Sequence, residues 1–430
     1  ILDILLAIAL AFALDLRVGI AVEQLEKLYK QIDSATTPEE KARLASETYE
    51  FITRLQKISA MATAKKIDPS YYLSIGDSTL SGYGLPKYTM GANNGEGQVL
   101  GDEAPVLLAQ KLFGADYEDH FKKLDKGGLR TNELLVWLGM EEYIDDFYNR
   151  YTIDDNAASK DTKYYQDLYQ SEIKKADLIT LTIGGVDVSS FVEKQIIALR
   201  DKGQPYEMDW TRFFPDADLT EIYAHIAEVQ GMLDGTLFEF MGVDAEDAAP
   251  LAAESFVYGF LNYMNNYVKA VDRIHEINPN AHIVLVGYFN TVDDMKLPIT
   301  IEGTTFELPV GALLGMLTET SNANALSYAL ANRDYATFVS TTDAETILDR
   351  DGKFDYESRL EGITTKPWLT HASEAGHEYI ANQIYTAITT EYTNEEIARA
   401  AFDAFLDYAK YLDEEFGDDE FEEFFDDDPG

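Results

Sequence analysis

The stretch that decides the fold reads YYLSIGDSTLSGYG and covers residues 71–84. Within it, Tyr71–Ile75 is a short apolar run that stops at Gly76, which indicates a buried strand. A turn of small residues after this strand would expose the hydroxyl of Ser78 and leave its backbone N–H free to face an anion. A serine hydroxyl is a poor nucleophile unless a base lies within hydrogen-bonding distance. The stretch therefore predicts a strand-end turn that carries a candidate nucleophile.

Further apolar runs of the same kind occur along the chain, with helical patterns between them. The other expected strands are Leu178–Ile183, His282–Val286 and Tyr335–Val339. The expected helices are Glu103–Phe113, Asn132–Tyr148, Ser255–Ile277 and Ser373–Thr389. Strands that alternate with helices favour an α/β fold with a parallel sheet. Because ligands of such sheets lie at the carboxyl ends of the strands, the site is expected beside the strands that end in glycine.

The composition excludes several classes of function. The 430 residues include 34 Lys and Arg but 77 Asp and Glu, so the formal net charge is −43. A chain this acidic repels phosphate backbones, and nucleic-acid binding is not expected. The chain has no cysteine, which excludes disulfides, thiolate metal sites and a cysteine nucleophile.

The chain divides into three parts by its patterns. Residues 1–69 are an expected N-terminal helical segment with a hairpin of two antiparallel helices over 20–67. Its apolar start is interpreted as a buried helix in preference to a clipped export signal. Residues 70–392 form the expected main domain, in which 188–254 and 290–333 are insertions that either cover the site or add packing. Residues 393–430 are predicted to form a helix followed by an acidic tail. The tail is expected to be solvated, or else to bind calcium or a partner whose identity is unknown. No segment is apolar over eighteen residues, so no integral membrane span is expected.

The base for Ser78 must be one of the six histidines. His371 begins the segment HASEAGHEYIANQI, just before the helix expected from Ser373. A histidine in a loop at a helix start is free to reach over the carboxyl edge of a sheet. His377 falls inside that helix and is interpreted as structural. The remaining histidines are interpreted as surface or core residues: His120, His225, His275 and His282.

Four segments together resemble the SGNH/GDSL hydrolases in order and spacing. They are GDS at 76–78, GGLRTNELL at 127–135, TLTIGGVD at 180–187 and HASEAGHEYIA at 371–381. The resemblance covers roughly residues 70–390 and leaves both insertions unmatched. It implies a flavodoxin-like three-layer α/β/α fold with esterase, lipase or carbohydrate-deacetylase chemistry. It implies no metal and no organic cofactor.

The resemblance also assigns roles. Ser78 matches the family nucleophile and, through its N–H, one oxyanion donor; Gly128 matches the second donor and His371 the catalytic base. Val186 stands where the family has an oxyanion-binding Asn, and Trp368 stands where it has the Asp of the triad. We expect the main-chain carbonyl of Trp368 to orient His371 instead, which would give a Ser–His dyad.

Other interpretations of these departures stay open. A carboxylate between the last strand and His371 could replace the missing acid, the candidates being Asp343, Asp349 and Asp351. Alternatively, the chain is a catalytically degenerate binding or scaffold protein on the same fold. If it is an enzyme, its expected substrate is a small-molecule or glycan ester, because the aromatic insertion 188–254 suits an acyl chain or a sugar face. The apolar start and the lack of cysteine favour a secreted or cell-envelope bacterial protein over a cytoplasmic one.

Overall fold

The structure is a computed structural model, and it describes ten segments of the chain. They are residues 50–51, 53–89, 98–144, 147–149, 162–213, 245–290, 297–301, 304–308, 310–351 and 370–416. The apolar start at residues 1–14 and the end of the acidic tail, 417–430, therefore lie outside the described residues. Within the expected N-terminal segment, residues 53–61 are helical.

A five-stranded sheet forms the centre of the molecule, and all its neighbouring strands are parallel. In spatial order the strands are β2 (Phe121–Lys123), β1 (Tyr72–Gly76), β3 (Leu178–Thr182), β4 (His282–Val286) and β7 (Ala336–Val339). This order is the flavodoxin-like one. Every residue of β1, β3, β4 and β7 is buried, which explains why each reads as an apolar run. The expected fold class and the four expected strands are confirmed.

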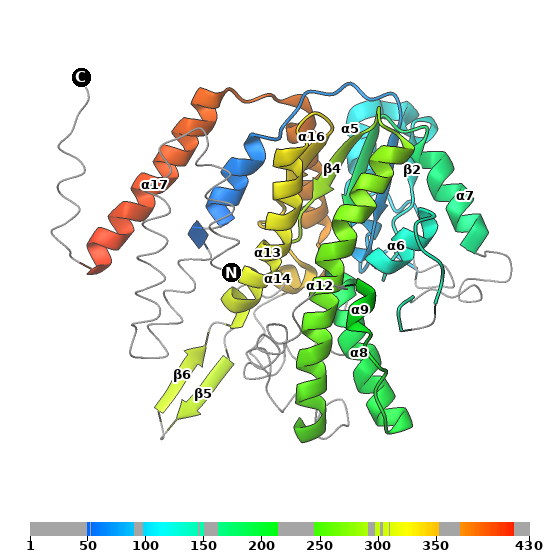
Figure 1. Ribbon diagram of the computed structural model, residues 1–430. Coiled ribbons are helices and arrows are strands. Elements are labelled where there is room, and N and C mark those ends of the chain that lie inside the picture. The colour runs from blue at the N-terminus through cyan, green and yellow to red at the C-terminus, as the bar shows by residue number, and fades with distance from the viewer. Residues whose placement is uncertain are drawn as a thin grey trace.

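Helices cover both faces of the sheet and complete three layers (Figure 1). One face packs against α5 (Ala104–Phe113) and α16 (Glu374–Thr389). The other packs against α6 (Thr131–Trp137), α7 (Thr162–Ile173), α12 (Ala245–Ile277) and α13 (Val310–Ala331). The apolar side chains of each strand alternate between these two cores, as the pleat of a strand requires.

The structure differs from the expected elements in three places. The helix expected over Asn132–Tyr148 ends at Trp137, and Gly139 follows it with a φ of +75°, which favours glycine over other residues. The helix expected over Ser255–Ile277 begins ten residues earlier, at Ala245. The strand β2 was not expected at all, because two of its three residues are lysines.

Both expected insertions contain regular structure. The segment 188–254 holds most of α8 (Gly185–Lys202), the short helix α9 (Trp210–Phe213) and the start of α12. The segment 290–333 holds a hairpin of β5 (Leu297–Ile301) and β6 (Thr304–Leu308), followed by α13. Since Ala325, Leu326 and Ala329 of α13 are buried against the sheet, this part of the second insertion belongs to the core.

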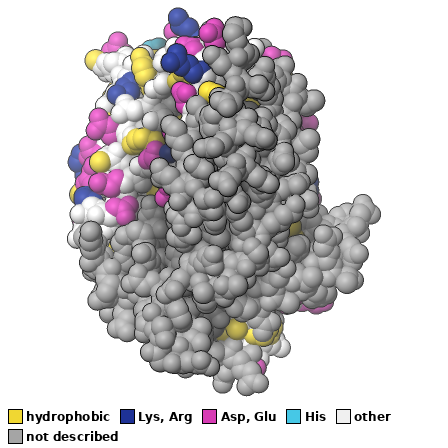
Figure 2. Space-filling view, turned by 90° about the vertical axis from the view of Figure 1, so that its left-hand side faces the viewer, with side chains coloured by type: hydrophobic (Ala, Val, Ile, Leu, Met, Phe, Trp, Pro, Cys, Tyr) yellow, Lys and Arg dark blue, Asp and Glu magenta, His cyan; other side chains and the backbone are white. Residues whose placement is uncertain are grey.

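The last described helix, α17 (Asn394–Phe416), packs beside residues 53–61. An exposed ion pair joins Arg54 to Asp407 at 2.8 Å, and a second joins Lys57 to Asp343 at 2.7 Å. Figure 2 shows this side of the molecule, where acidic, basic and apolar side chains lie interspersed over the part that the structure describes. In the described residues, no helix is both long enough and apolar enough to cross a membrane.

Candidate active site

Ser78 lies at the carboxyl end of β1, as the first residue of the short helix α4 (Ser78–Ser81). Asp77 caps this helix, since its Oδ1 accepts a hydrogen bond of 2.9 Å from the N–H of Thr79. The N–H of Asp77 donates to the carbonyl of Thr182 on β3 at 3.0 Å. Gly76 has no room for a side chain, because a Cβ there would come within 2.8 Å of Asp125 Oδ1. The turn is thus fixed from both sides and leaves Ser78 half-buried.

The structure brings His371 to Ser78 across 293 positions of sequence, with Nε2 at 2.8 Å from Oγ. His371 precedes α16, whose N-cap Ser373 accepts a hydrogen bond from the N–H of Gly376. Its own carbonyl accepts a hydrogen bond from Ile347, and its ring meets Tyr83 edge-on at 4.7 Å between centroids. The histidine is therefore held by its backbone and its ring while remaining half-exposed beside Ser78.

In the part of the chain that the structure describes, three backbone N–H groups at this edge of the sheet have no acceptor. Among the described residues, the N–H groups of Ser78, Gly128 and Val186 donate to no protein atom. Gly128 adopts a φ of +81°, a conformation that favours glycine. Val186 is the second residue of α8, where a backbone N–H has no partner inside its own helix. These groups are candidates to bind an oxyanion, although the side chain of Val186 cannot donate.

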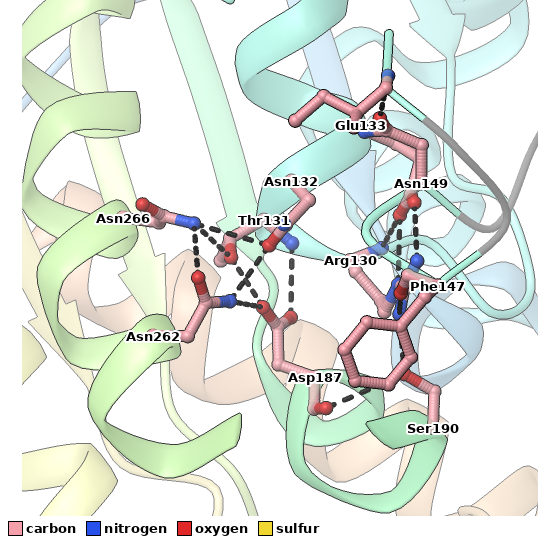
Figure 3. Close-up of polar contacts among 11 residues, drawn as sticks. Arg130, Thr131, Asn132, Glu133, Phe147, Asn149, Asp187, Ser190, Asn262 and Asn266 are labelled. Atoms are coloured by element: carbon pink, nitrogen blue, oxygen red, sulfur yellow. Dashed lines mark hydrogen bonds and ion pairs between the residues drawn. The ribbon is translucent and has the colours of Figure 1, made fainter. Parts of the chain in front are cut away.

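Behind Gly128 and Val186, a buried polar network ties their two segments together (Figure 3). Asp187 accepts hydrogen bonds from both the N–H and the hydroxyl of Thr131, the first at 3.0 Å. Asn262 of α12 reaches Asp187 at 3.5 Å and Asn132 at 2.7 Å, and Asn266 donates to Thr131 and Asn132. Burial raises the pKa of Asp187 to about 7, against the opposing effect of the Thr131 hydrogen bonds. Asp187 thus connects the start of α8 to Thr131 of α6 and to Asn262 of α12.

Arg130 extends the same support. It is fully buried, and its Nη2 pairs with Glu133 at 2.9 Å. Its Nη1 donates to the Phe147 carbonyl and the Ser190 hydroxyl at 3.1 and 3.0 Å (Figure 3). A buried guanidinium that uses its nitrogens in this way fixes the backbone around it. The segment that carries Gly128 is therefore anchored to α8.

The three acids considered as replacements for the triad Asp have partners elsewhere. Asp343 binds Lys57 at 2.7 Å and accepts from Tyr379, Asp349 accepts from the N–H and hydroxyl of Thr346, and Asp351 binds Arg350. Trp368, whose carbonyl we expected to orient His371, lies outside the described residues.

His377 is buried inside α16, in agreement with its structural interpretation. Its Nδ1 accepts a hydrogen bond from the N–H of Ala104, so the neutral ring carries its proton on Nε2. Burial, with smaller contributions from Lys123 and His371, lowers the pKa of His377 from 6.5 to about 3. The folded protein therefore keeps this ring neutral at pH values where the unfolded chain protonates it.

This difference predicts a pH-dependent stability. Between pH 6.5 and pH 3 the unfolded state binds one more proton at His377, so the free energy of unfolding falls as the pH falls. The free energy of unfolding of the wild type is expected to fall by about 2 kcal/mol more than that of His377→Gln between pH 7 and pH 5. Urea unfolding of both proteins at the two pH values measures this, and a pH-independent difference would contradict it.

Two residues near the site were not found from the sequence. Tyr288 is the second residue after the end of β4, and its hydroxyl contacts Asp77 at 2.5 Å. Lys123 on β2 is buried and donates to the carbonyl of Ser81, the last residue of α4, at 2.7 Å. The glycine at the end of the expected strand His282–Val286 was a usable signal for Tyr288, because it marked a strand end at the site's edge. No signal pointed to Lys123.

Comparisons with known proteins give structural neighbours alone, because no family model and no curated protein matches the chain. An extracellular lipase from Streptomyces rimosus is similar at 14% identity over 75% of this chain and 100% of that chain, with a TM-score of 0.38. A phospholipase A1 from Streptomyces albidoflavus NA297 is similar at 14% identity over 75% and 99%, with a TM-score of 0.36. The lipase Lip_vut3 from a goat rumen metagenome is similar at 14% identity over 74% and 97%, with a TM-score of 0.33.

Proposed function

We propose that this protein is a serine hydrolase that cleaves carboxylic esters through a Ser78–His371 dyad. The observation that carries the proposal is the 2.8 Å contact between Ser78 Oγ and His371 Nε2 at the carboxyl edge of the parallel sheet. A hydroxyl and an imidazole at this distance have the geometry of a nucleophile and its base. The SGNH/GDSL-like sheet order and the resemblance of the four sequence segments support the same chemistry.

In the proposed reaction, His371 Nε2 takes the proton of Ser78 as Oγ bonds to the ester carbonyl carbon. The tetrahedral oxyanion binds the N–H groups of Ser78 and Gly128, and His371 then protonates the leaving alcohol as the C–O bond breaks. Water, deprotonated by His371, attacks the acyl-enzyme; Ser78 leaves with the proton, and the acid is released. The main-chain carbonyl of Trp368 is proposed to accept the Nδ1 proton of His371 and so fix its tautomer.

The substrate class follows from the surroundings of the dyad. We propose a small-molecule or glycan ester, because the protein's negative charge disfavours polyanionic substrates. Tyr83 lies edge-on to His371, and Tyr88 lies edge-on to Tyr83 at 5.2 Å between ring centroids. Such rings suit an apolar chain or a sugar face. We also propose a secreted or cell-envelope location.

The test is the hydrolysis of p-nitrophenyl esters of increasing acyl length, together with labelling by a serine-reactive phosphonate. We expect turnover of at least one ester and a covalent adduct on Ser78, located by peptide mass spectrometry. No hydrolysis at any acyl length combined with no adduct would favour the alternative, a catalytically degenerate binding or scaffold protein. That alternative rests on two sequence features, Val186 and Trp368, which stand where the family has an Asn and an Asp.

Substitution of Val186 tests whether the oxyanion site lacks a donor. Loss of one such donor typically costs about 10²–10³ in turnover, so Val186→Asn is expected to raise kcat by about 10-fold or more. Val186→Ala is the matched control, because it removes side-chain volume without adding a donor. Steady-state kinetics on the best ester measure both variants. An unchanged or lower kcat for Val186→Asn would mean that the loop is built differently from that of the family.

A further inference from the structure

Tyr288 connects three strand ends at the site through one hydroxyl group. This hydroxyl donates to Asp77 Oδ2 at 2.5 Å, beside the nucleophile, and accepts from the N–H of Gly185 at 2.8 Å. Its ring also packs on Gly185, where a Cβ would lie 3.0 Å from the ring. The turn after β1, the turn after β3 and the turn after β4 therefore meet at a single side chain.

The backbone of Tyr288 is itself held in place. Asn322 of α13 accepts from the N–H of Tyr288 at 2.7 Å and donates to its carbonyl at 2.8 Å. The amide of Asn322 also reaches Glu319 at 3.3 Å, and the hydroxyl of Thr341 donates to the carbonyl of Gly287 at 2.6 Å. These contacts fix the backbone of Tyr288, and the bonds to Asp77 and Gly185 fix its hydroxyl.

Burial and the nearby charge of Asp77 keep the Tyr288 hydroxyl protonated, so it acts as a hydrogen-bond donor and not as a base. Burial raises the pKa of Asp77, and the hydrogen bond from Tyr288 is the first of the contacts that oppose this effect. Burial, together with the charge of Asp77, raises the pKa of Tyr288 well above its usual range. The phenol therefore stays protonated and takes no proton from the substrate.

We propose that Tyr288 is a positioning residue that fixes the turn of Ser78 relative to the turn Gly184–Val186, an inference that rests on the proposed ester hydrolysis. Asp77 links the hydroxyl to the first turn, because its other carboxylate oxygen caps α4. Gly185 links it to the second turn, which carries the unpartnered N–H of Val186. Small displacements between a nucleophile and the donors that face its substrate lower the rate of the chemical step.

The test replaces Tyr288 by Phe, which removes the hydroxyl and keeps the ring. We expect kcat on p-nitrophenyl esters to fall by about 10- to 100-fold, with KM within about twofold of the wild type. The shape of the pH profile of kcat/KM should stay the same, because Tyr288 transfers no proton. Tyr328→Phe is the matched control: it removes a similar hydrogen bond, of 2.6 Å to Asp272, next to Tyr335 at the amino end of β7. Its kcat should stay within about twofold.

Asp77→Asn is the second variant, and it decides the outcome if Tyr288→Phe does not fold. The new amide can still cap α4 through its oxygen, but its NH2 group then faces the phenol and cannot accept the phenol proton. The hydrogen bond donated by Tyr288 is lost, so a similar loss of kcat is expected. The double variant should be no slower than the slower single variant, since both changes remove the same link. If the folded variant at Tyr288 or Asp77 keeps a kcat within twofold of the wild type, or if Tyr328→Phe loses as much, the inference is overturned and the proposed function is not affected. A wild type that hydrolyses none of the esters would overturn the proposed function and this inference with it.

Discussion

Replacement of Ser78 by Ala is expected to lower kcat/KM for the best ester by at least about 10³-fold. The hydroxyl is the proposed point of covalent attachment, and its oxygen lies 2.8 Å from Nε2 of His371. The folded state should be unaffected, because Ser78 is half-buried and alanine differs from it only by the hydroxyl group. Steady-state kinetics and urea unfolding measure the two effects separately.

Steady-state kinetics of a second variant, His371→Ala, test whether Ser78 and His371 act as one unit. His371→Ala should cost about as much as Ser78→Ala, and the double variant should be no slower than either single variant. Ser171→Ala on α7 and His120→Ala are matched controls, since both side chains are exposed. Additive losses in the double variant would mean that Ser78 and His371 contribute through separate steps, which would contradict a dyad.

The fold could be predicted from the sequence because its central strands are buried on both faces. Such strands read as apolar runs whatever the details of their packing, and His282–Val286 agrees with its expected bounds at both ends. The strand β2 could not be predicted in this way, because Lys123 is polar in sequence and buried in the structure. Its partner Glu103 lies 20 positions away, and no local pattern shows that the two charges meet.

The candidate site could be predicted only where its residues carry a recognisable motif. Ser78 and His371 were found because each stands in a segment that resembles a motif of a known family. Tyr288 and Asn322 were not found, because their roles depend on hydrogen bonds to partners 211 and 34 positions away. The same holds for Asn262 and Asn266, which look like ordinary polar residues of a helix but lie buried against Asp187 and Thr131. Long-range polar contacts of this kind leave no periodic signal.

Replacement of Lys123 by Met is expected to destabilise the folded protein by about 3–5 kcal/mol. The side chains of Lys123 and Glu103 are exposed by 1% and 0%, and their charged atoms lie 3.1 Å apart. The ammonium also donates to the carbonyls of Ser81 and Gln98 at 2.7 and 2.8 Å. Loss of the amine therefore leaves a buried carboxylate without its counter-ion and two carbonyls without this donor, which costs more than the pair itself contributes. Urea unfolding at pH 7 measures the change.

The double variant Lys123→Met with Glu103→Gln separates the two causes. It removes the uncompensated charge, so part of the stability should return. In the wild type, the N–H groups of Leu100 and Gly101 each donate to one carboxylate oxygen of Glu103. The single oxygen of the glutamine can keep one of these two bonds. Arg54→Met is the matched control, because it breaks an exposed pair with Asp407, which is worth about 1 kcal/mol or less. A loss below 1 kcal/mol for Lys123→Met would contradict the prediction, since it would mean that water reaches Glu103. Because Lys123 holds the last residue of α4, folded Lys123→Met should also be slower on esters, which would connect this buried pair to the geometry of Ser78.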